Sequence, residues 1–308
     1  MPALRVVIDT DPGVDDAVAI LLALASPELD VRAITTVAGN VDLGLTTLNA
    51  RRLVELAGRR DVVVAAGCAH ALTGPMEHEG GVHGRDGLGD LTWDEPSVPL
   101  DTADGPDVIW RVLEEAPATI VAIGPLTNLA TLLERHPDAP ARVERVVVMG
   151  GASYEGNVTP AAEFNVWADP EAAARVVAAP WPLTVMPLDL THQATLDDGD
   201  LAFLRTLGTE VGRRVAGMLE PYAAFHERWY GSRDVIMHDA VAVYELIDPA
   251  AIAKQGVALE VETGGVHSRG ATWFDRRRVH SASRIRVGLS VDNARFVALL
   301  RERLASYP

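Results

Sequence analysis

The chain has 308 residues, of which 48% are hydrophobic, and carries a formal net charge of −16 at pH 7. This apolar content supports a large core, while the negative charge repels the phosphate backbone and excludes nucleic acid as an expected partner. The single cysteine, Cys68, excludes an intrachain disulfide. The sequence has no signal-peptide pattern and no apolar run of the roughly 18 residues that a membrane helix needs. We therefore expect a cytoplasmic protein.

The N-terminal stretch joins an apolar strand pattern at 4–8 to an apolar helix pattern at 17–25 through a turn at Pro12 and Gly13. Carboxylates crowd this turn: Asp9, Asp11, Asp15 and Asp16. Carboxylates this close repel one another unless some are protonated or a cation lies among them, and oxygen ligands favour Ca²⁺ or Mg²⁺. A helix N-cap would explain only one or two of them. The stretch therefore predicts a metal or substrate site.

Strand and helix patterns then alternate along the chain. The expected strands are 31–37, 62–66, 119–123, 143–149 and 183–186, and the expected helices are 45–56, 108–113 and 126–133. This alternation predicts one doubly wound, Rossmann-like α/β domain over residues 1–308, with a mostly parallel open sheet and helices on both faces. Ligands bind such sheets beyond the carboxyl ends of the strands.

Polar residues recur directly after these strands. They are Asn40, the Thr127-Asn128 pair, the loop residues Asn157, Glu163 and Asn165 that follow Met149-Gly150-Gly151, and Asp189. Each alone is an ordinary turn or cap residue, but their repetition at the same end of successive strands predicts a shared site. The glycine-rich stretches lack a Walker lysine and dinucleotide spacing, so we expect neither ATP nor NAD.

Two later segments complete the candidate site. The aperiodic, glycine-rich stretch 73–99, with His78 and His83, predicts a long loop that acts as a lid. The aromatic stretch 221–235, with His226 and Tyr230, has a helical spacing that suits core packing as well as stacking on a ligand. His238 and Asp239 then stand at the start of an apolar helix. Two interpretations are open: Asp239 is a simple helix cap, or the pair belongs to the site. Shorter strands at 257–261, 271–274 and 285–289 precede a final amphipathic helix.

The run Asp-Thr-Asp-Pro-Gly-Val-Asp-Asp-Ala at 9–17 resembles the N-terminal signature of the nucleoside hydrolase family, the inosine-uridine preferring type. Further motifs in that family's order are Ala-Ile-Thr-Thr-Val-Ala-Gly-Asn at 33–40, Val-His-Gly at 82–84, Gly-Pro-Leu-Thr-Asn at 124–128, Met-Gly-Gly at 149–151, Ala-Glu-Phe-Asn-Val at 162–166, Ala-Asp-Pro-Glu-Ala at 168–172, Leu-Asp-Leu-Thr-His at 188–192 and His-Asp-Ala at 238–240. The resemblance implies a Ca²⁺-dependent N-glycosidase that releases a free base and ribose from a ribonucleoside in purine or pyrimidine salvage. It also implies a homodimer or homotetramer.

The same resemblance implies roles for individual residues. The Ca²⁺ ligands are Asp11, Asp16, Asp239 and the backbone carbonyl of Thr127. The ribose diol binds to Asp15, Asn40 and Asn165, the 5′-hydroxyl binds to Asn157 and Glu163, and Met149 packs against the sugar. The base faces His83, His226, Tyr230 and His238. The two loops that carry base contacts match loosely, so purine and pyrimidine bases both stay open.

The chemistry suits these residue types. Cleavage of an N-glycosidic bond builds positive charge on the ribose, which carboxylates and amide oxygens such as that of Asn165 stabilise. A metal lowers the pKa of the attacking water, Asp11 can remove its proton as general base, and His238 can donate a proton to the departing base.

Two alternatives remain at this point. Asp-x-Asp after a first strand also resembles the nucleophile motif of Mg²⁺-dependent dehalogenase-type phosphatases, with Asp9 or Asp11 as nucleophile. Such an enzyme needs a phosphate-binding lysine, yet Lys254 is the only lysine and lies outside every strand-end cluster. The second alternative is a nucleoside-binding protein that has kept the pocket and lost turnover.

Overall fold

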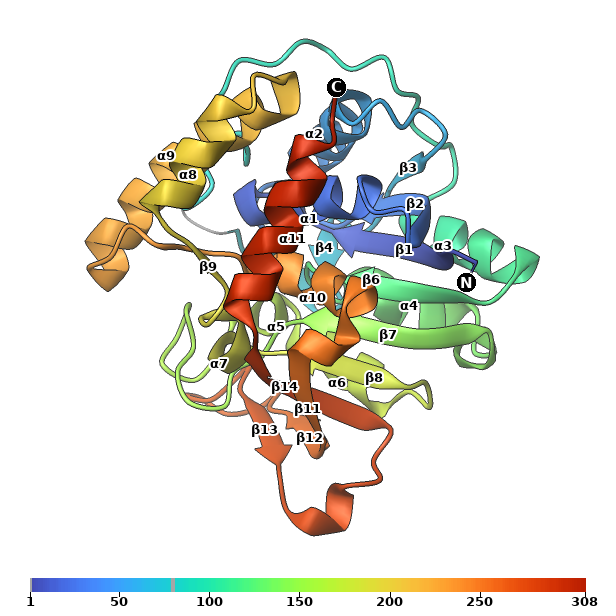
Figure 1. The fold of residues 1–308 in the computed structure, drawn as a ribbon. Helices are drawn as coiled ribbons and strands as arrows, with labels where there is room; N and C mark the ends of the chain where they lie inside the picture. The colour runs from blue at the N-terminus through green and yellow to red at the C-terminus, as the bar shows by residue number, and fades with distance from the viewer. Residues whose placement is uncertain (1, 79–80) are drawn as a thin grey trace.

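The computed structural model describes residues 2–78 and 81–308, so Gly80 of the predicted lid lies outside the described residues. A twisted central sheet crosses the molecule with helices on both sides (Figure 1). Its eight strands have the order β11-β14-β8-β7-β6-β1-β2-β3. The pairs within this sheet are parallel, except that β11 runs antiparallel to β14. The predicted fold class is therefore confirmed.

The strands of this sheet are β1 (Leu4–Thr10), β2 (Leu29–Thr36), β3 (Val63–Ala66), β6 (Ala118–Ala122), β7 (Val143–Met149), β8 (Leu183–Met186), β11 (Ile252–Gly256) and β14 (Ile285–Val291). The main helices are α1 (Val14–Leu24), α2 (Leu43–Leu56), α3 (Gly105–Glu115), α4 (Thr127–Arg135), α6 (Pro170–Ala178), α8 (Asp198–Thr206), α9 (Glu210–Tyr230), α10 (His238–Ile247) and α11 (Asn293–Ala305). The short helices α5 (Phe164–Ala168) and α7 (Leu188–Thr191) follow β7 and β8. Two-stranded pairs are β4 (His70–Ala71) with β5 (Gly74–Pro75), β9 (Thr195–Leu196) with β10 (Val235–Ile236), and β12 (Ala258–Val261) with β13 (Thr272–Asp275).

Local chemistry accounts for where several helices begin and end. The Asp42 carboxylate accepts from the Leu45 amide at 3.0 Å and caps α2. Asp104 caps α3 in the same way, with a proline in the first turn, where a missing N–H costs nothing. Helix α9 ends at Gly231, whose φ of 77° is the left-handed conformation that glycine adopts without strain.

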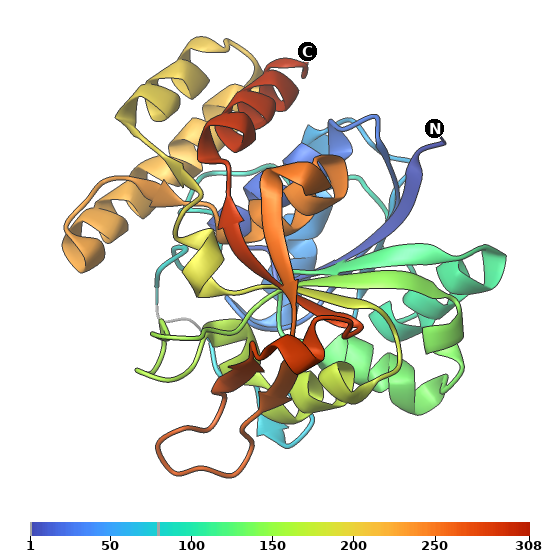
Figure 2. The same cartoon turned by 60° about the horizontal axis from the view of Figure 1, so that its bottom comes forward.

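Two apolar cores cover the two faces of the sheet. One joins α1, α2, α9, α10 and α11, with buried side chains such as Leu21, Leu53 and Phe296. The other joins α3, α4 and α6 through side chains such as Ile109 and Leu129. Figures 1 and 2 show this sandwich, with α11 and α9 on the opposite side of the sheet from α3, α4 and α6. Burial on both faces explains why the central strands are nearly continuous apolar runs.

The strand order reverses beside β1. The chain passes from β1 to β2 and β3 on one side, then crosses to β6, β7 and β8 on the other. The reversal lies between β1 and β6, which pair from Val6 to Asp9. In open parallel sheets the crevice at this point binds ligands, because the two connecting loops turn away from each other there. The fold therefore places the residues after Thr10 and after Ala122 at the binding crevice.

The predicted lid segment, 73–99, contains no helix and only the short strand β5 among its described residues. It is tied to α2, because Arg51 donates to the carbonyls of Pro96 and Val98 at 2.8 and 2.7 Å, and Asn49 donates to that of Asp86 at 2.7 Å. Within residues 2–78 and 81–308, the helices are all too short or too polar to cross a membrane.

Candidate active site

A cavity of about 410 Å³ opens at this crevice. Predicted site residues on its lining are Asp15, Asn40, His83, Met149, Asn157, Glu163, Asn165, His226, Tyr230, His238 and Asp239. The remaining predicted residues, Asp11, Asp16 and Thr127, are at most 1% exposed and do not line the cavity. The structure thus brings segments that are more than 200 residues apart in the sequence into one site. Most of the predicted residues line the cavity, and Asp11, Asp16 and Thr127 lie buried.

Three carboxylates form the most acidic point of the site. Asp15, Asp16 and Asp239 each offer an oxygen, and these oxygens lie within 4.8 Å of one another. Burial, with the Asp16 charge adding to it, raises the pKa of Asp15 to about 8. Burial and the neighbouring carboxylates hold the pKa of Asp239 well above its usual range. The cluster cannot be fully ionised at neutral pH without a cation, which is the electrostatic condition of a metal site.

Asp11 leaves one carboxylate oxygen open beside this cluster. Its Oδ2 accepts from the backbone amide of Asn40 at 2.7 Å, whereas its buried Oδ1 has no hydrogen-bond partner among the described residues. A Cβ atom at Gly124 would lie 2.5 Å from Oδ1, so a glycine is needed there for the backbone to approach. Burial, followed by repulsion from Asp16, raises the pKa of Asp11 well above its usual range. An orphaned carboxylate oxygen beside other carboxylates fits a hard cation such as Ca²⁺.

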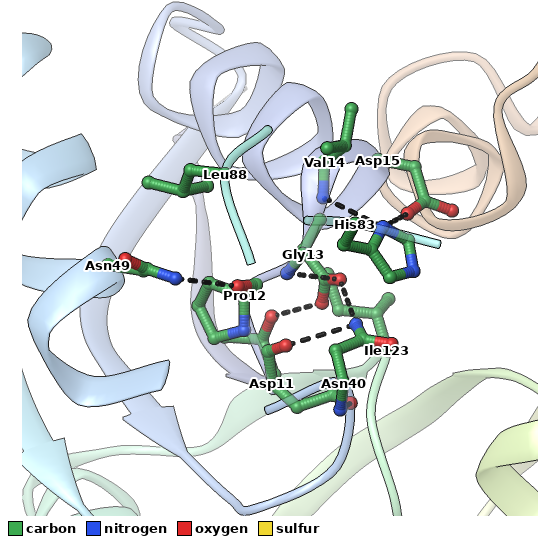
Figure 3. Close-up of polar contacts among 12 residues, drawn as sticks. Asp11, Pro12, Gly13, Val14, Asp15, Asn40, Asn49, His83, Leu88 and Ile123 are labelled. Carbon is green, nitrogen blue, oxygen red and sulfur yellow. Dashed lines mark hydrogen bonds and ion pairs between the residues drawn. The ribbon is translucent and has the colours of Figure 1, made fainter. Parts of the chain in front are cut away.

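Asp16 is held rigidly by its surroundings. Its Oδ1 accepts from the Thr10 hydroxyl at 2.6 Å, and its Oδ2 accepts from the Gly13 amide at 2.9 Å and from Asn40 Nδ2 at 3.0 Å. Asn40 Nδ2 also donates to the Asp11 carbonyl at 3.1 Å (Figure 3). One asparagine therefore joins both aspartates. This arrangement fixes the carboxylates before any ligand arrives.

Thr127 begins helix α4 with both of its oxygens engaged. Its hydroxyl donates to Asp169 at 2.7 Å, and its carbonyl accepts from the Thr131 hydroxyl at 2.9 Å. The structure thus shows this carbonyl already hydrogen-bonded, and its role as a cation ligand stays a prediction.

Asp9 differs from the other aspartates of the N-terminal stretch. Its Oδ1 accepts from Thr35 Oγ1 at 2.5 Å and from Asn128 Nδ2 at 2.7 Å. Burial raises the pKa of Asp9 to about 7 against the effect of these bonds. Asp9 therefore ties β1 to β2 and to the start of α4, and it lies outside the close carboxylate group.

The opposite wall of the cavity comes from the loop after β7 and from α5. Glu163 caps α5 by accepting from the Asn165 amide at 2.9 Å, and it also accepts from the Gly151 amide at 2.9 Å. Asn157 Oδ1 accepts from the Phe164 amide at 2.9 Å. Asn165 Nδ2 donates to the carbonyls of Ile123 and Met149, at 3.1 and 3.2 Å, and so spans the ends of β6 and β7. Because the amide nitrogen is used in this way, the amide oxygen of Asn165 is its remaining acceptor for a ligand.

Histidines and aromatic rings line the remaining wall. His83, Tyr222, His226 and Tyr230 follow one another with ring centroids 5.4, 4.5 and 5.4 Å apart. Burial lowers the pKa of His83 and of His226 to about 4, so both are neutral at pH 7. His83 Nδ1 accepts from the Val14 amide at 3.1 Å, which leaves its N–H on Nε2 (Figure 3). His226 is 2% exposed, and its Nδ1 has no partner in the described part of the chain.

The aromatic stretch contributes both to the core and to the wall of the cavity. Tyr222 belongs to the apolar core of α1 and α9, and it also lines the cavity together with Phe225 and Trp229. The helix begins at Glu210, well before the aromatic stretch, and continues through Pro221. The cavity-lining side chains lie in the C-terminal part of this helix, from Tyr222 to Tyr230.

His238 begins α10 beside Asp239 and is buried. Burial, with the nearby histidines, lowers the pKa of His238 well below its usual range. Its Nδ1 lies 2.8 Å from the Thr191 hydroxyl. Neither Thr191 nor Asp169, which holds Thr127, was among the candidates from sequence, although both stand within family-like motifs. Their buried hydrogen bonds are tertiary contacts that a motif alone does not show.

The position of Lys254 is a further argument against the phosphatase alternative. Lys254 lies on β11 and pairs with the buried Glu245 at 2.7 Å, and it does not line the cavity.

Comparisons with known proteins agree with this geometry. The model of the inosine-uridine preferring nucleoside hydrolase family matches residues 6–298. The pyrimidine-specific ribonucleoside hydrolase RihA of Photobacterium profundum is 38% identical over 98% of this chain and 99% of its own length, and that of Citrobacter koseri is 40% identical over 99% of both. A solved plant nucleoside hydrolase, the PpNRh1 enzyme, superposes with a TM-score of 0.94 at 36% identity, over 99% of this chain and 100% of that one. The chain therefore belongs to the inosine-uridine preferring nucleoside hydrolase family and is an N-glycosidase of ribonucleosides.

Proposed function

We propose that this hydrolase depends on Ca²⁺, that Asp11 is its general base, and that it prefers pyrimidine ribonucleosides. The observation that carries the metal assignment is the unpartnered, buried Oδ1 of Asp11 beside the close carboxylates Asp15, Asp16 and Asp239. Asp11, Asp16, Asp239 and the carbonyl of Thr127 would hold the ion. Asp15 lines the cavity, whereas Asp16 does not, which supports Asp15 as the carboxylate that faces the ribose.

The chain's own residues account for the chemistry of hydrolysis. When bound, the ion would supply positive charge that lowers the pKa of a nearby water. Asp11 takes the proton of that water, whose oxygen adds to C1′ of the ribose while the C1′–N bond breaks and its electron pair leaves with the base. Asp15, Asn40 and Asn165 hold the 2′- and 3′-hydroxyls, and Asn157 and Glu163 hold the 5′-hydroxyl. The carboxylates and the Asn165 amide oxygen stabilise the positive charge that develops on the ring.

The preference for pyrimidines rests on the relatives. The RihA proteins, at 38 to 40% identity over nearly the full length, are named as pyrimidine-specific. Solved enzymes named as purine-preferring or as inosine-guanosine hydrolases share less sequence, at 29 and 30% identity. The base-side wall is made of neutral histidines and aromatic rings, which stack on a planar base and offer it hydrogen bonds.

The experiment is a kinetic panel on the purified protein, before and after prolonged chelation. We expect release of base from uridine and cytidine at higher kcat/KM than from inosine, adenosine and guanosine. Chelation should abolish turnover, and Ca²⁺ should restore it. Full activity in protein that elemental analysis shows to be free of metal would overturn the metal assignment, and a purine preference would overturn the base assignment.

The homodimer or homotetramer and the cytoplasmic location stay predictions. Light scattering coupled to size-exclusion chromatography tests the first, and cell fractionation tests the second.

A further inference from the structure

A buried threonine contacts the histidine that faces the base. Thr191 is the last residue of α7, which follows β8 and packs against α10. Its side chain is fully buried, and its Oγ1 lies 2.8 Å from Nδ1 of His238. The contact joins two segments 47 residues apart, so it depends on the packing of α7 against α10.

The neighbouring groups indicate the direction of this hydrogen bond. Among the residues that the structure describes, the other acceptor near the Thr191 hydroxyl is the Leu188 carbonyl, at the longer distance of 3.4 Å. That carbonyl already accepts from the His192 amide at 2.9 Å. The hydroxyl hydrogen therefore has its better acceptor at Nδ1 of His238, because hydrogen bonds weaken with distance.

The second ring nitrogen of His238 is left for the substrate. His238 lines the cavity, and because its Nδ1 contacts Thr191, Nε2 is the ring nitrogen available to a ligand. A neutral imidazole carries one N–H and one acceptor nitrogen, so a ring that accepts at Nδ1 carries its hydrogen on Nε2.

We propose that Thr191 is a positioning residue that holds His238 in the Nε2–H tautomer, with this N–H directed at the base. The inference rests on the base-side role given to His238 in the proposed function. As the C1′–N1 bond of a pyrimidine nucleoside breaks, its electron pair enters the ring and spreads onto the adjacent carbonyl oxygen. His238 Nε2–H donates a hydrogen bond to that oxygen and keeps its proton, so the base leaves as a hydrogen-bonded anion.

The reverse arrangement has a different consequence. If Nδ1–H donated to Thr191, the lone pair of Nε2 would face the cavity and would repel the charge that builds on the base. The tautomer of His238 therefore decides whether this side chain assists or opposes departure of the base, and a hydroxyl outside the cavity sets it.

The kinetic test compares three variants on two substrates. Thr191→Val keeps the shape and removes the hydroxyl, and Thr191→Ser keeps the hydroxyl. Thr119→Val is the matched control, because the Thr119 hydroxyl is also buried but has no partner among the described residues. The base of uridine leaves poorly unless a hydrogen bond stabilises the charge that builds on it, whereas p-nitrophenyl riboside releases an anion that is already stabilised. We expect Thr191→Val to lower kcat on uridine about tenfold with KM changed by less than about twofold, as loss of one hydrogen bond predicts.

The same variant should change kcat on the nitrophenyl substrate by less than about twofold. Thr191→Ser and Thr119→Val should match the wild type on both substrates. Equal losses of kcat on the two substrates would show that Thr191 supports only the fold, and unchanged kcat on uridine would equally overturn the proposal.

Nitrogen NMR of the Ca²⁺-loaded enzyme gives a readout that a purely structural role would not move. With ¹⁵N-labelled histidine, the His238 signals are assigned by their loss in His238→Ala. The wild type should show a protonated Nε2 and an unprotonated Nδ1, and Thr191→Val should shift this balance toward Nδ1–H. A wild type with Nδ1–H would overturn the proposal. A wild type that releases no base from any nucleoside would instead overturn the proposed function, while the NMR result would still test the role of Thr191.

Discussion

Asp9→Asn tests how the fold controls the ionisation of a carboxylate behind the site. Asp9 is 0% exposed, with Thr35 and Asn128 on Oδ1 and no partner for Oδ2 among the described residues. Burial raises its pKa from 3.8 to about 7. The folded protein thus keeps Asp9 protonated in a pH range where the unfolded chain ionises it.

The sign and size of the effect follow from linkage. Because the folded-state pKa lies above the unfolded value, the stability contributed by this group is fully present below about pH 4 and is lost as pH rises through about 7. The difference of the two values, 7 minus 3.8, is about 3 pKa units, which corresponds to ~4 kcal/mol. Asparagine keeps an oxygen for Thr35 and Asn128 and has no charge to bury. The variant should therefore lack this part of the pH dependence.

The assay is urea denaturation of the wild type and the variant in chelator at a series of pH values from about 4 to about 9. The other buried carboxylates are common to both proteins, so the difference in free energy of unfolding isolates Asp9. As the pH rises across this range, the free energy of unfolding of the variant should increase relative to that of the wild type by on the order of 4 kcal/mol. Asp94→Asn, at an exposed position, should give a flat difference. A flat difference for Asp9→Asn as well would refute the reasoning.

Three further predictions concern the site itself. Asp11→Asn should lower kcat by at least ~10²-fold, since it removes the proposed base, and near wild-type kcat at saturating Ca²⁺ would assign that role elsewhere. Asp16→Ala should mainly weaken Ca²⁺ binding in isothermal titration calorimetry, and an unchanged affinity would remove Asp16 from the ligand set. His238→Ala should lower kcat on uridine by ~10²-fold or more and that on p-nitrophenyl riboside only slightly, whereas equal losses would assign His238 to the fold or to the metal.

Local sequence was sufficient for much of the sheet. The strands at Val143–Met149 and Leu183–Met186 begin and end where their apolar runs predict, because polar or turn residues bound them on both sides. Helix α3 begins earlier than its apolar pattern, at Gly105, because Asp104 caps it and Pro106 suits its first turn. Helix α9 begins at Glu210, where a threonine cap precedes a polar, amphipathic stretch that the aromatic pattern does not include.

The sequence by itself also determined which residue types the site contains. The aspartates crowded around Pro12 predict a site that holds protons or a cation where they are buried together, because like charges repel at close range. The alternation of strands and helices placed Asn40, Thr127 and Asn165 at one edge of the sheet, since the carboxyl ends of parallel strands share that edge.

Only the tertiary structure decided which contacts each of these residues makes and whether it is ionised. Asp9 and Asp11 are two positions apart, yet Asp9 contacts Thr35 and Asn128, whereas Asp11 leaves an oxygen open beside the carboxylate cluster. Asp239 joins that cluster because α10 packs against α1, and no local pattern contains that contact. Burial then sets the protonation of these carboxylates, since the cost of an ionised group depends on everything packed around it and not on its neighbours in sequence.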